Sequence, residues 1–407
     1  MKNFSLNCGQ KSFLDDEPKT TLKNITIEEK EYIRFINEFW TSKQRQGSSI
    51  HEVSYRACFK PQLPKFFIEL LTEKGDVIYD PFSGRGTTVV EAGILGRDII
   101  SNDINPLSKI MAKPRFFVPQ IKEVEERLKQ ISLDTKAKAE IDLSMFYHPD
   151  TEKELVSLKH YLNEQKKINQ EDHIDSWIRM VATNRLTGHS RGFFSVYTLP
   201  PNQATSPERQ IKINKRRNQK PEYRNIKKLI LRKSKSLLRN LQEEEIKNLY
   251  NAGTKSLFTN SDARDVPMIK DESVDLTVTS PPFLDVVQYH KDNWLRCWFN
   301  SIDSEQISKN ITMSKTIKDW CDTMGDVFHE LYRVTKKDGW VAFEVGEIRG
   351  GKIKLDEYVV PLGLNAGFTC LGILINLQEF TKTSNIWGVK NNDYGTNTNR
   401  IVLFVKE

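Results

Sequence analysis

The fold class is decided by the stretch Asp80-Pro-Phe-Ser-Gly84-Arg-Gly86-Thr-Thr88. A short apolar segment before it, Asp76–Tyr79, predicts a strand, and the apolar positions of Val89–Ile94 after it predict a helix. Further along, Arg97–Ser101 predicts a second buried strand that ends at Asn102-Asp103. This order of strand, glycine turn, helix and strand is typical of a doubly wound, mostly parallel α/β sheet.

The glycine turn predicts a ligand site at the end of the first strand. Gly84 and Gly86 allow a tight turn and a close approach by a ligand. The third glycine of a dinucleotide fingerprint is absent, because Val89 stands there, and the P-loop lysine is absent too, so a dinucleotide or a triphosphate is disfavoured. Two more acidic residues, Asp103 and Asp262, also follow predicted strands. Together with Asp80 they are expected along one sheet edge, although a single Asp in such a place often only caps a turn.

The rest of the chain indicates an α/β domain with a helical insertion. Further strands are predicted at Ser256–Asn260, Val274–Thr279, Trp340–Val345, Ile373–Glu379 and Arg400–Lys406, the last two as an antiparallel hairpin at the sheet edge. We therefore expect a catalytic domain at 51–114 plus 255–407 and a mainly helical insertion at 115–254. Residues 1–50 are expected to be an N-terminal helical extension, because Tyr32, Ile33, Ile36 and Trp40 have helical spacing within Ile27–Trp40.

The glycine turn resembles the S-adenosylmethionine-binding motif of the amino-group (N4-cytosine and N6-adenine) DNA methyltransferases. Phe59-Lys60-Pro61 resembles the segment of that family that closes over the methionine end of the cofactor, and Asp103 and Asp262 match its ribose and adenine positions. The resemblance implies a Rossmann-like class I methyltransferase sheet and S-adenosylmethionine as cofactor, without a metal. It implies that the following residues bind the cofactor: Phe59, Lys60, Pro61, Asp80, Pro81, Phe82, Gly84, Gly86, Thr87, Thr88, Asp103 and Asp262.

A second motif, Ser280-Pro281-Pro282-Phe283, resembles the catalytic loop of the same family. An exocyclic amino nitrogen is a poor nucleophile, because its lone pair is delocalised into the ring. The Ser280 hydroxyl and the Pro281 carbonyl can accept its two hydrogens and stabilise the charge that develops on nitrogen. Two prolines make the loop rigid, and Phe283 can stack on a flipped-out base.

The first residue of this loop bears on the substrate. In the family that the motif resembles, serine is associated mainly with cytosine N4, so we predict a cytosine-N4-specific DNA methyltransferase of a restriction–modification system. Cytosine C5 chemistry needs a cysteine, typically after proline, and none of the five cysteines follows a proline. Alternatives are an adenine N6 DNA methyltransferase, an RNA amino-group methyltransferase and a catalytically silent DNA-binding protein.

Double-stranded DNA is the expected partner, and the insertion carries the densest basic stretch, from Arg209 to Arg239. Arginine and lysine at this density suit phosphate contact, although a solvated helical face is the alternative. The segment Asn184–Asn214, expected to be largely loop, combines side chains that can read base edges. The candidate DNA-binding residues are Arg185, His189, Arg191, Asn202, Gln203, Arg209, Lys215, Arg216 and Arg217.

Composition agrees with a globular protein that has a polyanionic partner. The 407 residues carry a net charge of +7, and 38% of them are hydrophobic. The cysteines form no CxxC pair, so neither a disulfide framework nor a zinc site is predicted. No apolar run has the length of a membrane span, and no signal peptide is recognisable, so a cytoplasmic protein is expected. A cognate restriction endonuclease that acts on the same DNA site is a possible further partner.

Overall fold

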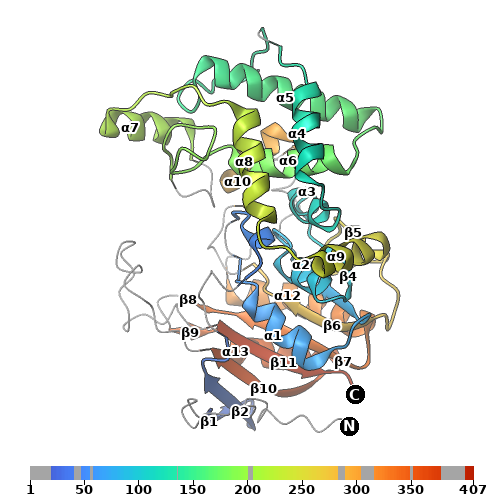
Figure 1. Ribbon diagram of the computed structural model, residues 1–407. Helices are drawn as coiled ribbons and strands as arrows, with labels where there is room; N and C mark the ends of the chain where they lie inside the picture. Colours follow the sequence, from blue (N-terminus) through green and yellow to red (C-terminus); the bar gives the residue numbers. More distant parts are fainter. Residues whose placement is uncertain are drawn as a thin grey trace, which may run out of the picture.

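The computed structural model describes residues 20–40, 47–55, 58–134, 136–199, 205–282, 289–303, 316–348, 352–376 and 399–407. Within these ranges, nine strands form one sheet in the order β1-β2-β10-β11-β7-β6-β3-β4-β5 (Figure 1). Their bounds are Thr21–Ile27 (β1), Lys30–Asn37 (β2), Val77–Asp80 (β3), Asp98–Asn102 (β4), Leu257–Thr259 (β5), Val274–Thr279 (β6), Thr335–Val345 (β7), Thr369–Asn376 (β10) and Asn399–Val405 (β11). A separate small ribbon pairs β8 (Glu347–Ile348) with β9 (Ile353–Lys354).

The centre of the sheet is parallel, as the sequence predicts. β3 pairs in parallel with β4 on one side and with β6 on the other, and β5 and β7 continue the parallel arrangement outward. β11 then runs antiparallel between β7 and β10. Because β3, β4 and β6 point the same way, their carboxyl ends meet at one edge of the sheet, which is where an open α/β sheet binds its ligand.

The prediction of a helix over Ile27–Trp40 is wrong, because this segment is part of a β-hairpin. Glu28 and Glu29 both have positive φ and form a two-residue turn, with Ile27 paired to Lys30 across it. β2 then pairs in parallel with β10, so the β10–β11 hairpin lies inside the sheet and not at its edge. The apolar positions that suggested a helix face both sides of the sheet. Tyr32 and Ile36 pack into one hydrophobic core, whereas Phe35 packs into the other.

Helices cover both faces of the sheet. On one face lie α1 (Gln62–Leu71), α2 (Thr87–Ile94) and α9 (Glu243–Lys255), and on the other lie α12 (Ile317–Val334) and α13 (Asp356–Ala366). α9 packs on α2 and β4, so the end of the sequence region that we predicted to be an insertion belongs structurally to the sheet.

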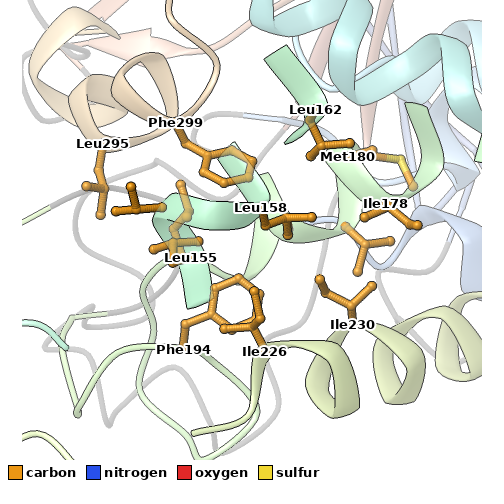
Figure 2. Close-up of a cluster of buried hydrophobic side chains, with 14 of the residues drawn as sticks. Leu155, Leu158, Leu162, Ile178, Met180, Phe194, Ile226, Ile230, Leu295 and Phe299 are labelled. Atoms are coloured by element: carbon orange, nitrogen blue, oxygen red, sulfur yellow. The ribbon is translucent and has the colours of Figure 1, made fainter. Parts of the chain in front are cut away.

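A mostly helical region lies beyond one end of the sheet (Figure 1). It contains α3 (Leu107–Ala112), the short helix η3 (Lys113–Phe116), α4 (Ile121–Gln130), α5 (Pro149–Lys167), α6 (His173–Arg185), α7 (Pro207–Arg217) and α8 (Ile226–Leu238). Figure 2 shows its core, in which side chains of α5, α6 and α8 meet Leu295 and Phe299 of α10 (Tyr289–Phe299). Residues from after the catalytic motif therefore complete the core of the helical region.

Helix α7 occupies the end of the segment Asn184–Asn214, which we expected to be largely loop. The Ser206 side chain accepts a hydrogen bond from the Arg209 backbone N–H, and Pro207 occupies the first turn. Asn218 ends the helix in the left-handed conformation. These are ordinary helix boundaries, and the proline-rich composition of the surrounding segment concealed them.

Candidate active site

One cleft opens at the carboxyl ends of β3, β4 and β6. Its lining includes the three acidic residues that follow predicted strands, namely Asp80, Asp103 and Asp262. Ser280 and Pro282 of the second motif line the same cleft. The structure thus brings together two motifs that lie about two hundred residues apart in the sequence, as expected if both belong to one site.

The glycine turn is held by the end of the neighbouring strand. The Gly84 backbone N–H donates a hydrogen bond of 2.8 Å to Oδ2 of Asp103, and the Asn105 N–H donates one of 2.9 Å to Oδ1. Gly84 and Gly86 both have positive φ, at +51° and +78°. The turn therefore needs glycine at these positions, and it presents Gly84 to the cleft.

Two hydrogen bonds join the glycine turn and its helix to the strand that leads into the Ser280-Pro281-Pro282 motif. The Thr279 hydroxyl donates to Oδ1 of Asp80 at 2.7 Å, and the Thr88 hydroxyl donates to the Val278 carbonyl at 3.0 Å. All four residues are buried. The relative position of the two motifs is therefore fixed by buried bonds, and it does not depend on a flexible loop.

Burial changes the acidity of the carboxyl groups in the cleft. It raises the pKa of Asp80 to about 7, although hydrogen bonds from Thr279 and the Phe82 backbone oppose it. Burial likewise raises the pKa of Asp103 to about 6. Both groups would regain their charge beside a positively charged ligand or beside hydroxyl donors.

Asp262 differs from the other two carboxylates because it is paired with a cation. Arg264 donates from Nε to Oδ1 at 3.0 Å and from Nη2 to Oδ2 at 2.6 Å, and it holds the pKa of Asp262 below its usual range. A carboxylate oxygen keeps a second lone pair after one such bond. Asp262 can therefore still accept a hydrogen bond from an adenine amino group.

The cleft fits S-adenosylmethionine better than it fits a phosphate-bearing nucleotide. Three carboxylates line it, and Arg264, whose guanidinium is bound to Asp262, is the only lysine or arginine among the described lining residues. Acceptors suit ribose hydroxyls, an adenine amino group and a sulfonium cation, and they would repel a pyrophosphate. The apolar side chains of Phe59, Phe82 and Ala263 provide surface for an adenine ring.

The catalytic motif is held by two further residues that sequence reasoning did not find. The indole Nε1 of Trp320, on α12, donates to the Pro282 carbonyl at 3.0 Å. Glu344, a buried residue near the end of β7, lies next to Ser280 in register, and Ser280 lowers the pKa of Glu344 against the effect of burial. Neither contact has a signal in the sequence, because α12 and β7 reach the loop only through the sheet topology.

Several predicted cofactor residues do not line the cleft. Pro61 borders a different cleft beside α1 and α9, Lys60 is exposed, and Gly86 and Thr88 support the turn from behind. Pro81, Phe82 and Thr87 do line the cleft, and Pro281 is buried beside it. Phe283 lies outside the described residues. Tyr55, Cys58 and Met324, which sequence reasoning did not single out, line the cleft as well.

The basic residues divide into structural and exposed groups. In α8 and beside it, Arg224 donates to the backbone of the 188–199 loop, Lys227 donates to the Ile131 carbonyl, and Lys233 and Arg239 pair with Glu52. Much of this stretch therefore supports the fold. In α7, by contrast, the side chains of Arg209, Lys212, Lys215, Arg216 and Arg217 are all exposed.

The base-reading candidates are distributed unevenly. His189 and Arg191 are exposed, whereas Arg185 is largely buried with its guanidinium 4.0 Å from the Phe193 ring. That burial lowers the pKa of Arg185 to about 10. Arg217 lies 3.8 Å from the Tyr197 ring. Asn202 and Gln203 lie outside the described residues.

The described residues contain neither a cluster of metal-binding side chains nor a membrane-spanning helix. Among them, no three His, Cys, Asp or Glu residues are grouped so as to hold a metal ion. No helix in the described ranges is both long and apolar enough to cross a membrane.

Comparison with known proteins agrees with these features. A family model for DNA methylases, N6_N4_Mtase, matches residues 10–114. The type II methyltransferase M.BsoBI of Geobacillus stearothermophilus is 25% identical over 79% of this chain and 68% of its own length. The type II methyltransferase M.MvaI of Kocuria varians is 25% identical over 63% of this chain, and the match spans 56% of that relative. A solved structure described as a putative DNA modification methylase from Thermus thermophilus, in complex with S-adenosylmethionine, is 21% identical over 36% of this chain and 53% of its own, with a TM-score of 0.23.

Proposed function

We propose that the chain is an amino-group DNA methyltransferase, and that it transfers a methyl group from S-adenosylmethionine to N4 of cytosine in duplex DNA. The observation that carries the proposal is the single cleft that contains both Asp80, Asp103 and Asp262 and the Ser280–Pro282 motif. S-adenosylmethionine would supply an electrophilic methyl group there. We assign its ribose to Asp103, its adenine to Asp262 and its methionine end to the region of Gly84 and Phe59.

The chain's own contribution to the reaction is position and charge. Ser280 and the Pro281 carbonyl accept the hydrogens of the target amino group and favour a tetrahedral nitrogen with an available lone pair. They also stabilise the positive charge on nitrogen as the bond to the methyl carbon forms. The bonds from Thr279 to Asp80 and from Thr88 to Val278 keep this nitrogen site at a fixed place relative to the cofactor turn.

The choice of cytosine N4 rests on Ser280, because serine at the head of this motif is associated mainly with that base. Adenine N6 is the alternative on the same scaffold, and the product of the reaction decides between them. The base would have to leave the duplex to reach the cleft, because its amino group is otherwise paired.

We assign DNA binding to the helical region, with α7 as a phosphate-contacting element. Its five exposed basic side chains are spread over nine residues, with Glu208 as the one acidic residue of the helix. His189 and Arg191 extend from the neighbouring loop and are candidates for base contacts. We also propose a cytoplasmic location and, as a partner, a restriction endonuclease that acts on the same DNA sequence.

The experiment is a methylation assay with product identification. The protein is incubated with S-adenosylmethionine that carries a labelled methyl group and with duplex DNA, single-stranded DNA or RNA, and the digested nucleosides are separated. Labelled N4-methylcytosine from duplex DNA is the expected product. N6-methyladenine would overturn the choice of base, and label in RNA alone would overturn the choice of nucleic acid.

A variant links the product to the proposed site. Ser280→Ala removes one acceptor, so kcat should fall by about a hundredfold while the Kd for S-adenosylmethionine changes little. Unchanged kcat would place the chemistry elsewhere. A large loss of cofactor binding would mean that Ser280 belongs to the cofactor site.

A further inference from the structure

Glu344 is a buried carboxyl that the proposed reaction does not use directly. It lies on β7, where Phe343 pairs with Thr279 of β6, so Glu344 is next in register to Ser280. The exposed fraction of Glu344 is 7%, and it is not among the residues that line the cleft. It can therefore influence the reaction only through its neighbours.

Two polar side chains lie beside the Glu344 carboxyl. The side-chain Nδ2 of Asn399 donates a hydrogen bond to its Oε1 at 2.9 Å, and Ser280 is its neighbour in register. Burial raises the pKa of Glu344, and Ser280 and Asn399 both act against this rise. No lysine or arginine is bonded to Glu344 among the described residues. The Glu344 carboxyl thus lies beside neutral polar side chains and not beside a cation, and an ionised carboxylate buried in this way is costly.

We propose that Glu344 is a positioning residue that takes the hydroxyl hydrogen of Ser280, so that the Ser280 oxygen faces the cleft as an acceptor only. A serine hydroxyl has one hydrogen and two lone pairs. If the hydrogen pointed into the cleft, it would repel the hydrogens of the target amino group. With the hydrogen on Glu344, both lone pairs are free for them. This inference rests on the proposed function, because it concerns how Ser280 acts on an amino group.

The bond from Asn399 makes the role testable with a nearly isosteric change. In Glu344→Gln the amide oxygen can still accept from Asn399, and the amide nitrogen is then directed at Ser280. The nitrogen can only donate, so the Ser280 hydroxyl hydrogen loses its acceptor and turns toward the cleft. The size and packing of the side chain are retained. A merely structural role of Glu344 would not predict an effect that depends on Ser280.

The experiment is a double-mutant cycle on the full-length protein, with single-turnover methylation of duplex DNA and the Kd for S-adenosylmethionine as separate readouts. Glu344→Gln should lower the methyl-transfer rate by about tenfold to a hundredfold, with the Kd nearly unchanged. In the Ser280→Ala background the same change should cost less than roughly twofold, because the hydroxyl that it acts on is gone.

A matched control is Glu330→Gln, a similarly buried glutamate on α12 that pairs with Arg333. It lies ten residues beyond Trp320, which is about 15 Å along the helix. This control should lower the melting temperature without a selective loss of the transfer rate.

Two results would overturn the proposal. The first is an additive cycle, in which Glu344→Gln costs as much without the Ser280 hydroxyl as with it. The second is an unchanged rate in Glu344→Gln. Both leave the proposed function intact, whereas a wild-type protein that methylates no nucleic acid would overturn the proposed function itself.

Discussion

Replacing Gly86 by alanine should destabilise the protein through two separate effects at the cofactor turn. The residue has φ of +78°, a conformation that costs an L-residue with a Cβ roughly 1–2 kcal/mol. An added Cβ would also lie 2.6 Å from the Cβ of Ala112 and 3.3 Å from a guanidinium nitrogen of Arg115. Since both neighbours are fully buried, they have little room to move. Overpacking of this kind costs roughly 1–3 kcal/mol, so the total loss is about 2–5 kcal/mol.

Gly84→Ala is the matched control, because it shares the backbone effect and lacks the steric one. Gly84 has φ of +51°, and the nearest atom to an added Cβ is 3.5 Å away on the Tyr55 ring. Its expected loss is the backbone cost alone, roughly 1–2 kcal/mol. Gly84 lines the cleft and Gly86 does not, so Gly84→Ala should weaken S-adenosylmethionine binding by more than its effect on stability suggests.

The measurement is urea unfolding of both variants and the wild type, without cofactor and at one pH. Gly86→Ala should have the lower midpoint, with a slope m equal to that of the wild type. Equal free energies of unfolding for the two alanine variants would refute the reasoning, because they would show that the added Cβ at Gly86 causes no steric cost. A changed slope would instead indicate an altered unfolded or native state.

Three further predictions concern pH, salt and the catalytic loop. Asp80 and Asp103, with pKa values of about 7 and 6, are largely neutral below pH 6, and a cationic ligand needs them ionised. S-adenosylmethionine should therefore bind more tightly as pH rises from 5.5 to 7.5, by up to about tenfold per pH unit for each proton released, and a calorimetric Kd that does not change with pH would contradict this. In a filter-binding titration, Lys215→Glu in α7 should weaken DNA binding and make the slope of log K against log salt concentration shallower by about one unit. Lys247→Glu in α9 should change neither the affinity nor this slope. Trp320→Phe removes the hydrogen bond of 3.0 Å from the indole to the Pro282 carbonyl. The free energy of unfolding should fall by about 0.5–1.5 kcal/mol, and kcat should fall more than the affinity for the cofactor. A kcat equal to that of the wild type would show that this bond has no part in positioning the loop.

The parts of the fold that follow from local sequence were predictable. The strand before Asp80, the strand before Ser280 and the acidic strand ends each have a short-range signal, and parallel topology then places them at one edge. The order of β10 and β11 as an antiparallel pair was predictable for the same reason, and the match of a DNA methylase family model to residues 10–114 agrees with the motif at Asp80–Thr88.

The remaining parts depend on contacts between distant segments. The hairpin at 21–37 was mistaken for a helix, because its apolar residues face two cores and so lack a clean alternation. Glu344 and Trp320 have no local motif, and only the pairing of β7 with β6 and the packing of α12 bring them to the catalytic loop. Structural bonds of α8, such as that from Lys227 to Ile131, likewise cannot be distinguished from free phosphate-binding side chains by composition.

The pairing of β2 with β10 has a consequence for how the protein is made. Ile36 pairs with Ile375, and Arg34 forms ion pairs with Asp356 and Glu357. The β1–β2 hairpin therefore finds its neighbour only after some 340 further residues have been added. At typical synthesis rates this delay is roughly 20–70 seconds, during which the free edge and apolar face of the hairpin are exposed in the cell. Nascent chains that are released in this interval should consequently be open to aggregation or to chaperone capture through this hairpin.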